Sequence, residues 1–328
     1  MTKTYTAIAL FSGGLDSLLS VLWMQKHGVK VIPVFFRTPF FTEERSMQTA
    51  AANGLKLEVI DISEAHLEMM KNPRYGFGKN FNPCIDCHGL MFKLAGQLLL
   101  KYNADFLISG EVLSQRPMSQ RRDAMNAVSN LSGFKDLLIR PLSQQLLADT
   151  KPIREGWIRK EDMLAISGRS RKPQLALAKE LGVTEFPGPG GGCRLTDKNF
   201  SVRLRDLVEH NQLALPEISL LKYGRHFRLD DKTKLIIGRD EADNDNMINF
   251  QAGFLLLLNE EIPGPLGLLC ARNIDEKLLS QAASILAYYN SKSPQDVTIS
   301  YGFSFPLEKS ITVEKANIDM VSELMIKE

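Results

Sequence analysis

One stretch of this chain decides its fold, and it reads Phe11-Ser12-Gly13-Gly14-Leu15-Asp16-Ser17. The apolar residues 7–11 at its start predict a buried strand, and apolar residues recur at helical spacing from Leu18 to Met24. The glycine turn is therefore expected at a helix N-terminus, where partial positive charge and unobstructed backbone N–H groups can bind an anion such as pyrophosphate. No Gly-Lys-Ser/Thr follows the turn, which excludes a Walker-type loop.

Strands alternate with helices over the next hundred residues. Residues 29–38, 56–61 and 105–109 predict strands, whereas residues 42–53 and roughly 88–101 predict helices. Such alternation is typical of an α/β fold with a doubly wound parallel sheet, in which ligands bind beyond the carboxyl ends of the strands. The glycine turn is expected at that edge of the sheet.

The character of the sequence changes near residue 187. A proline- and glycine-rich loop covers residues 187–193, and a helix is expected over 200–211. Residues 224–238 then predict a strand, a turn and a second strand, and a helix is expected over 275–289. We therefore expect an α/β domain at residues 1–200, a linker helix at 201–222 and a smaller α+β domain at 223–328.

Composition sets broad limits on the chain. Its 328 residues, of which 44% are hydrophobic, suffice for two cores. No apolar run approaches the roughly 18 residues of a membrane helix, and no secretory leader opens the sequence, so a cytoplasmic location without a membrane partner is expected. The net charge of +2 demands no polyanionic partner. Basic clusters at residues 116–122 and 169–172 are nevertheless suited to phosphate contacts.

The four cysteines are too few for a disulfide scaffold, and three of them form a pattern that indicates chemistry. Cys84 and Cys87 form a CxxC pair just before a predicted helix, and Cys193 follows a glycine run. Three thiolates can hold one metal centre with an open position, as in a [4Fe–4S] cluster whose free iron binds a group such as sulfide.

Two other uses of these cysteines stay open at this point. One is a structural zinc site completed by His88 or Cys270. The other is metal-free chemistry, in which Cys193 carries a persulfide that a thiol of the CxxC pair resolves. Cys270 lies in an apolar run and is most simply a small buried hydrophobic residue.

Several motifs resemble one enzyme family. Residues 12–17, Ser-Gly-Gly-Leu-Asp-Ser, resemble the PP-loop of the ATP pyrophosphatase superfamily, which has a HUP-like fold. Residues 110–115, Gly-Glu-Val-Leu-Ser-Gln, and 138–142, Leu-Ile-Arg-Pro-Leu, resemble segments of 4-thiouridine synthetases, and Ser119-Gln120 is similar to a following Ser-Gln of that family. Residues 223–244 look like the RNA-binding module of NFACT proteins.

The resemblance implies an ATP-dependent tRNA sulfurtransferase. Such an enzyme attaches a uridine carbonyl oxygen to the α-phosphate of ATP with the help of Mg²⁺, and sulfur from sulfide or a cysteine desulfurase then replaces the oxygen, here forming 4-thiouridine. The implied catalytic residues are Asp16, Cys84 and Cys193, and the implied metal ligands are Cys84, Cys87 and Cys193. The implied cofactor-binding residues are Phe11, Ser12, Gly13, Gly14, Asp16, Ser17, Phe35, Phe36, Arg37, Gly110, Glu111 and Gln115.

The chain also departs from the family pattern. Synthetases of this kind usually carry a THUMP domain before the PP-loop, whereas here the loop begins at residue 12, and nothing after residue 220 resembles a rhodanese domain. We expect residues 223–328 to dock tRNA instead, although a dimerisation module is an alternative and a homodimer is open. The basic side chains expected to contact tRNA are Lys222, Arg225, His226, Arg228, Lys232, Lys234 and Arg239.

Alternatives remain for the function and for one site residue. The chain could be a tRNA 2-thiouridylase, a different adenylating PP-loop ligase or a non-catalytic RNA-binding protein that retains an ATP fold. Glu111, assigned above to cofactor binding by resemblance, could instead be a carboxylate that caps a helix N-terminus.

Overall fold

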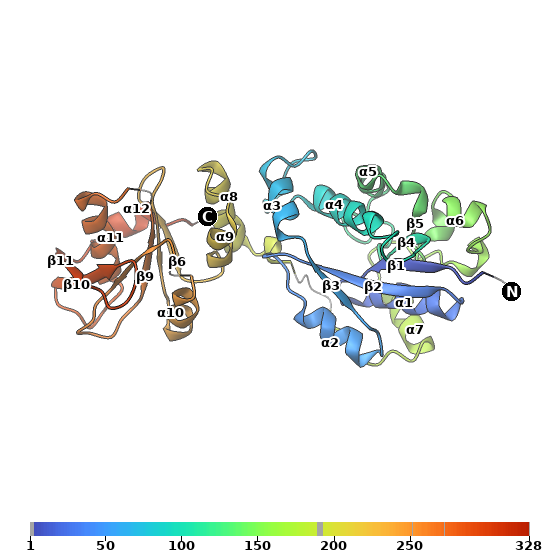
Figure 1. The fold of residues 1–328 in the computed structure, drawn as a ribbon, viewed down its shortest axis with the longest axis horizontal. Helices are drawn as coiled ribbons and strands as arrows, with labels where there is room; N and C mark the ends of the chain where they lie inside the picture. Colours follow the sequence, from blue (N-terminus) through green and yellow to red (C-terminus); the bar gives the residue numbers. More distant parts are fainter. Residues whose placement is uncertain (1–2, 189–192, 251, 272, 328) are drawn as a thin grey trace. The chain divides into compact units, whose positions relative to one another are not determined.

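The computed structural model describes residues 3–188, 193–250, 252–271 and 273–327 (Figure 1). The chain divides into two compact units, Met1–Arg194 and Leu195–Glu328, which we describe separately. None of the helices in the described ranges has the length and apolar character that crossing a bilayer requires.

The first unit is built on a five-stranded sheet in the order β3-β2-β1-β4-β5. Every pairing in it is parallel. This arrangement confirms the α/β class predicted from the alternation of strands and helices. The strands are β1 (Thr6–Leu10), β2 (Lys30–Arg37), β3 (Glu58–Asp61), β4 (Phe106–Ser109) and β5 (Leu138–Ile139).

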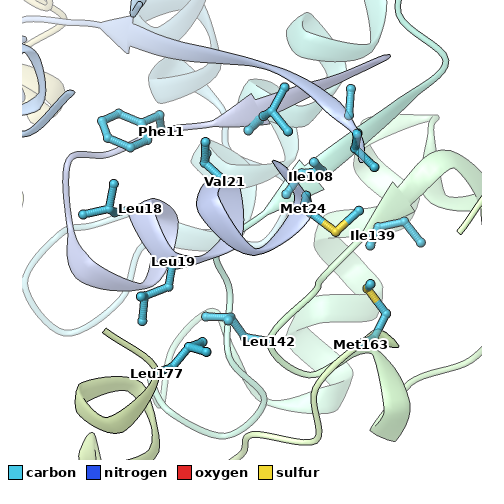
Figure 2. Packing of buried hydrophobic residues seen from close by; sticks show 14 of the residues in the cluster. Phe11, Leu18, Leu19, Val21, Met24, Ile108, Ile139, Leu142, Met163 and Leu177 are labelled. Atoms are coloured by element: carbon cyan, nitrogen blue, oxygen red, sulfur yellow. The ribbon is translucent and has the colours of Figure 1, made fainter. Parts of the chain in front are cut away.

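Helices cover both faces of this sheet (Figure 1). Successive residues of β1 point to opposite faces, so Ala7 packs with the core of α1 and α7, whereas Ile8 packs with the core of α4 and α5. Figure 2 shows the first of these cores, with Met24 of α1 beside Ile108 of β4. The helices are α1 (Leu15–Lys26), α2 (Glu44–Ala52), α3 (Ser63–Lys71), α4 (Cys84–Gln97), α5 (Arg122–Ser132), α6 (Lys151–Arg154) and α7 (Lys172–Glu180), and short 3₁₀ turns lie at Lys135–Leu137, Gln144–Leu146 and Lys160–Asp162.

Helix α4 begins four residues earlier than predicted. The backbone N–H of Cys87 donates to Pro83 O at 2.8 Å, which closes the first helical turn. Asp86 carries a negative charge in that turn, where the helix dipole favours it, and its carboxylate accepts N–H groups from Arg74 and Tyr75. The CxxC pair is therefore part of the helix, and the expectation that it precedes the helix is wrong.

The second unit is an antiparallel six-stranded sheet in the order β11-β10-β8-β9-β7-β6, which confirms the predicted α+β class. Helix α11 packs on one face, while α9 and α10 contribute to a second core. Its elements are α8 (Lys198–Glu209), α9 (Leu215–Leu220), β6 (Arg225–Arg228), β7 (Lys234–Ile237), α10 (Glu241–Ile248), β8 (Leu255–Leu258), β9 (Gly267–Cys270), α11 (Glu276–Tyr288), β10 (Asp296–Gly302), β11 (Lys309–Glu314) and α12 (Ile318–Leu324), and a 3₁₀ turn at Arg194–Thr196 leads into it.

The segment predicted as a linker helix, residues 201–222, contributes to α8 and α9 of the second unit. Asp206 of α8 forms ion pairs with Arg228 of β6 and with Lys234 of β7 at 3.0 Å. These contacts fasten α8 to the hairpin of β6 and β7, which forms where residues 224–238 predicted it.

Candidate functional site

The glycine turn joins β1 to α1 and is shaped by close backbone approach. Gly13 has a φ of +69°, and a Cβ atom there would lie 2.7 Å from Ser46 Cα, so no other residue fits. A Cβ atom on Gly110, which follows β4, would lie 2.6 Å from the backbone N of Ser17. The Ser17 hydroxyl donates to Gly14 O at 2.8 Å. The turn and the start of the segment after β4 therefore meet at the carboxyl edge of the sheet, as predicted.

Asp16 offers one free carboxylate oxygen at this edge. Its Oδ2 accepts a hydrogen bond of 2.8 Å from Gln115 Nε2, and Gln115 Oε1 accepts one of 2.9 Å from the buried Gln174. Its Oδ1 is also buried, but it has no hydrogen-bond partner among the described residues. A buried carboxylate oxygen without a partner is costly, which points to a ligand that this structure does not contain.

Glu111 lies at the centre of a buried charge network. Its Oε2 accepts from Arg140 Nε at 2.9 Å, and its Oε1 lies 2.9 Å from His88 Nδ1. Burial alone would raise the pKa of Glu111, but the charge of Arg140 and the hydrogen bonds from His88 and Arg140 outweigh it and lower that pKa to about 2. The helix-capping alternative is therefore wrong, since both carboxylate oxygens are engaged by the side chains of His88 and Arg140.

Two of the three predicted metal ligands, Cys84 and Cys193, lie within electrostatic range of the third, Cys87. Cys84 and Cys87 share the first turn of α4, and Cys193 lies close enough to Cys87 to act on it electrostatically. Burial first, then Cys193 and Cys84, raises the pKa of Cys87 well above its usual range. Burial also raises the pKa of Cys84, against a hydrogen bond from Asn82 Nδ2 to Cys84 Sγ at 3.2 Å and the charge of Arg116.

A buried histidine lies against this cysteine group. His66 Nε2 is 3.3 Å from Cys87 Sγ, and its Nδ1 has no partner in the described part of the chain. Burial lowers the pKa of His66 to about 4, so the imidazole is neutral near pH 7. No motif marks His66 in the sequence, so His66 is not among the predicted site residues.

No metal-holding geometry is present in the described ranges. Within residues 3–188, 193–250, 252–271 and 273–327, no group of three or more His, Cys, Asp or Glu side chains is arranged to hold a metal ion. Residues 189–192, which form most of the predicted glycine loop before Cys193, lie outside the described residues. Cys270 belongs to the second unit, is partly buried and contacts Glu217.

The residues predicted to meet adenine lie at the end of β2. The side chains of Phe35 and Phe36 are buried, whereas Arg37 is exposed and pairs with Asp61 and Glu43. A cavity of about 320 Å³ opens beside Phe36, and its lining includes Ile60, Ser63, Leu94 and Leu98. Phe11 lies in the core, so only its backbone belongs to the glycine turn.

The basic clusters of the first unit are only partly available. Arg121 pairs with Asp123 at 2.9 Å, and Arg122 donates to Leu146 O. Arg116 is exposed and close to Cys84, and Arg169 is exposed near α7. Arg116 therefore combines exposure to solvent with a charge that acts on Cys84.

In the second unit, several basic side chains predicted to contact tRNA serve the fold instead. Lys234 and His226 are buried, and Arg228 and Lys234 both pair with Asp206. Arg239 pairs with Asp243. The expectation that Lys234 and His226 contact tRNA is wrong, because burial removes both side chains from the surface. Arg228 and Arg239 are each neutralised by an aspartate, and their contact with tRNA stays a prediction. Lys232 is exposed, Lys222 is half-buried over the ring of Tyr223, and Arg225 stacks on Tyr289.

Comparison with known proteins supports both halves of the motif analysis. Residues 3–145 match the family described as thiamine biosynthesis protein (ThiI), and residues 224–325 match the family described as NFACT protein RNA binding domain. The two matches confirm the relationships that the motifs indicated for each segment.

The curated relatives include tRNA-modifying enzymes. A probable tRNA sulfurtransferase of Thermococcus kodakarensis is 31% identical over 140 residues, covering 41% of this chain and 36% of the relative. A probable tRNA sulfurtransferase of Thermoanaerobacter sp. strain X514 is 29% identical over 120 residues, covering 33% of this chain and 30% of the relative. The chain thus spans about a third of the length of these relatives. The tRNA-specific 2-thiouridylase MnmA of Streptococcus equi subsp. zooepidemicus is 25% identical over 283 residues, covering 74% of this chain and 71% of the relative.

Solved structures overlap with this chain only in part. A 4-thiouridine synthetase in complex with RNA and bound ATP shows 19% identity and a TM-score of 0.36, covering 55% of this chain and 52% of the other. The C-terminal part of the fibronectin/fibrinogen-binding protein from Streptococcus suis shows 15% identity and a TM-score of 0.28, covering 48% of this chain and 79% of the other.

Proposed function

We propose that this chain is an ATP-dependent tRNA sulfurtransferase that adenylates a uridine carbonyl oxygen and replaces it with sulfur, forming 4-thiouridine. One observation carries the proposal. Helix α4 bears Cys84 and Cys87 in its first turn, and the neighbouring His88 is bonded to Glu111. Glu111 directly follows Gly110, which packs on Ser17 of the glycine turn. A thiol group and an anion-binding turn thus share one buried framework, as a reaction that joins phosphate and sulfur chemistry requires.

The first step needs the glycine turn. A carbonyl oxygen is a poor leaving group, so it attacks the α-phosphorus of ATP, forming an oxygen–phosphorus bond while the bond to pyrophosphate breaks. The backbone N–H groups of Gly13 and Gly14 and the N-terminus of α1 stabilise the departing pyrophosphate, with the Ser12 and Ser17 hydroxyls beside them. The free Oδ1 of Asp16 is a hard oxygen ligand that suits Mg²⁺, which would offset triphosphate charge.

The adenine of ATP is assigned to the end of β2. Phe36 lines a cavity whose volume falls at the lower end of the range of ligand pockets. Phe35 is buried and Arg37 is held by two carboxylates, so these residues shape the strand end rather than offering free groups. Gln115 fixes Asp16, and Glu111 fixes α4 against the strand edge.

The second step needs sulfur at the cysteine group. Cys84 and Cys193 both act electrostatically on the buried Cys87, which supports a shared cationic centre, because a nearby cation would offset the cost of forming thiolates. Cys84, Cys87 and Cys193 would hold a [4Fe–4S] cluster, which when bound supplies an open iron position for sulfur derived from sulfide or a cysteine desulfurase. Completion of a zinc site by Cys270 is disfavoured because Cys270 contacts Glu217 within the second unit, whereas His88 keeps its Nε2 for a metal while its Nδ1 lies 2.9 Å from Glu111 Oε1.

The tRNA would be held by both units. The NFACT-type segment supports RNA binding by residues 224–325 through Lys232 and Arg225, with Lys222 just before the segment, rather than through the neutralised basic residues. Positioning through remote contacts can supply a large part of a rate enhancement, so an enzyme acting on one nucleotide of a folded RNA benefits from such a module.

Nucleoside mass spectrometry of tRNA from cells lacking this chain tests the proposal. Loss of 4-thiouridine, restored by the wild-type gene but not by one encoding Cys84→Ala, supports it. Loss of 2-thiouridine instead would identify a 2-thiouridylase. Unchanged thionucleosides would overturn the thiolation reaction and leave a different adenylating ligase or an RNA-binding protein without catalysis.

A further inference from the structure

An aromatic pair stands beside the cysteine group and has no role in the chemistry above. The loop of residues 72–83, which we call the aromatic loop, joins α3 to α4. In it the rings of Phe77 and Phe81 stack with centroids 3.8 Å apart and planes 8° from parallel. Aromatic pairs left to themselves prefer offset or edge-to-face arrangements, so the loop backbone imposes this stacking.

The aromatic loop is firmly held. The buried carboxylate of Asp86 accepts the N–H groups of Arg74 and Tyr75 at the start of the loop. The Gly78 N–H donates to Asn82 O, and the Phe81 N–H donates to Gly78 O. Phe81 adopts a φ of 56°, a left-handed conformation that a bulky residue adopts only where its surroundings enforce it. The ring pair is thus presented in one arrangement.

Polar and apolar groups suited to a nucleotide surround this pair. A Cβ atom on Gly78 would lie 2.7 Å from the terminal methyl carbon of Met118, so Met118 packs against the aromatic loop, and its side chain is 43% exposed. Arg116, two residues earlier, is exposed and lies close enough to Cys84 for its charge to act on the thiol. Lys79 is also exposed. The aromatic loop ends at Asn82 and Pro83, where the Asn82 amide donates to Cys84 Sγ.

We propose that the Phe77–Phe81 pair is a stacking platform for one unpaired nucleobase of the RNA substrate, with Arg116 and Lys79 at its phosphates. This inference rests on the proposed function and names how the RNA is held at that site. A base taken out of a folded RNA loses its stacking partners, and aromatic side chains restore that stacking whatever the base sequence. The platform adjoins Cys84, so a base stacked there lies next to the thiols.

Binding of single-stranded oligouridine to the intact protein tests the platform. Phe77→Leu removes the aromatic face and should weaken binding roughly 5- to 100-fold, whereas Phe77→Trp should retain wild-type affinity. Leu100→Ala is the control, because Leu100 is 94% exposed in the first unit and lies outside the aromatic loop. The affinity for ATP should be the same in all four proteins. Wild-type oligouridine affinity in folded Phe77→Leu would overturn the platform, and a parallel loss of ATP affinity in that folded variant would assign the rings to adenine.

A second measurement needs no variant. RNA carrying 5-iodouridine crosslinks under ultraviolet light to aromatic rings stacked on the base, so the wild-type protein should yield a crosslinked peptide from the aromatic loop. Crosslinks confined to other peptides would contradict the proposal. A protein that crosslinks through this loop but makes no thionucleoside would refute the proposed function and leave the platform intact. Wild-type kinetics of tRNA thiolation in the Phe77→Leu variant would refute the platform and leave the proposed function intact.

Discussion

Gln115 Nε2 donates a 2.8 Å hydrogen bond to Asp16 Oδ2 and leaves Asp16 Oδ1 buried without a partner in the described part of the chain. One oxygen is thus fixed by the protein, and the other is directed to a ligand. This division orients the carboxylate at the start of α1 for the ATP that we propose binds there.

Asp16→Asn should lower ATP-dependent pyrophosphate release at least about 100-fold, because the variant loses the negative charge that would help to hold Mg²⁺ and the triphosphate. Circular dichroism and the unfolding midpoint should stay close to wild type. Asp123→Asn is the control, since Asp123 is an exposed aspartate at the start of α5. Normal pyrophosphate release by folded Asp16→Asn would remove the assignment of the glycine turn to ATP.

Glu111→Gln should lower the free energy of unfolding by about 3 kcal/mol, because it leaves the buried Arg140 guanidinium without its charged partner. Urea denaturation at neutral pH measures the change. Glu155→Gln is the matched control, since Glu155 is exposed and makes only a 3.9 Å surface pair with Lys151, and it should change stability by less than about 0.5 kcal/mol. Equal stability of both variants would show that the buried network contributes nothing.

The same network makes stability depend on pH in one direction. The pKa of Glu111 is lowered to about 2 in the folded chain, against about 4.3 for an ordinary glutamate in the unfolded chain. Its stabilisation is therefore present above about pH 4.3 and disappears as the pH falls toward 2. The gap in unfolding free energy between wild type and Glu111→Gln should accordingly narrow from about pH 5 downward. A gap that is constant down to pH 2 would contradict this origin.

The cysteine assignment predicts a sharp pattern among alanine variants. Anaerobically purified wild type should contain iron and acid-labile sulfide and should show visible absorbance, and Cys84→Ala, Cys87→Ala and Cys193→Ala should each lose all three. Cys270→Ala should keep them, because Cys270 belongs to the second unit. A colourless, active wild type with stoichiometric zinc or with no metal would refute the cluster.

Charge reversal at Lys232 should weaken tRNA binding by the second unit. Lys232 is exposed on the β6–β7 hairpin, so Lys232→Glu in the intact chain should reduce the affinity for tRNA. The slope of log Kd against log salt concentration should fall by the amount that corresponds to about one lost phosphate contact. Lys277→Glu, on the exposed start of α11, is the control. If both variants bind tRNA as tightly as wild type does, the tRNA contact lies elsewhere, and Arg116 is the first residue to test.

The sequence motifs predicted the frame of this site because the glycine turn is a local signal. A strand, two glycines and a helix can be recognised from neighbouring residues, and alternation then orders the sheet. The sequence pattern misplaces the start of α4, because it predicts Cys84 and Cys87 before the helix, whereas the Cys87 N–H donates to Pro83 O and closes the first turn.

Side-chain partners across the fold could not be predicted in this way. His66 meets Cys87 from another helix, and Gln174 reaches Gln115 across 59 positions. The hairpin pattern predicts Lys234 as a surface charge, but all four residues of β7 are buried, and Lys234 pairs with Asp206 of α8. Such contacts depend on the packing of elements distant in sequence, which single-sequence patterns do not record.

The most direct test of the central claim is reconstitution of the reaction. Anaerobically purified protein is incubated with unmodified tRNA transcript, ATP, Mg²⁺ and sulfide, and nucleoside mass spectrometry is combined with quantification of AMP and pyrophosphate. We predict 4-thiouridine in the tRNA, with one AMP and one pyrophosphate formed for each sulfur inserted. ATP hydrolysis without any thionucleoside, or sulfur insertion without ATP cleavage, would contradict the account.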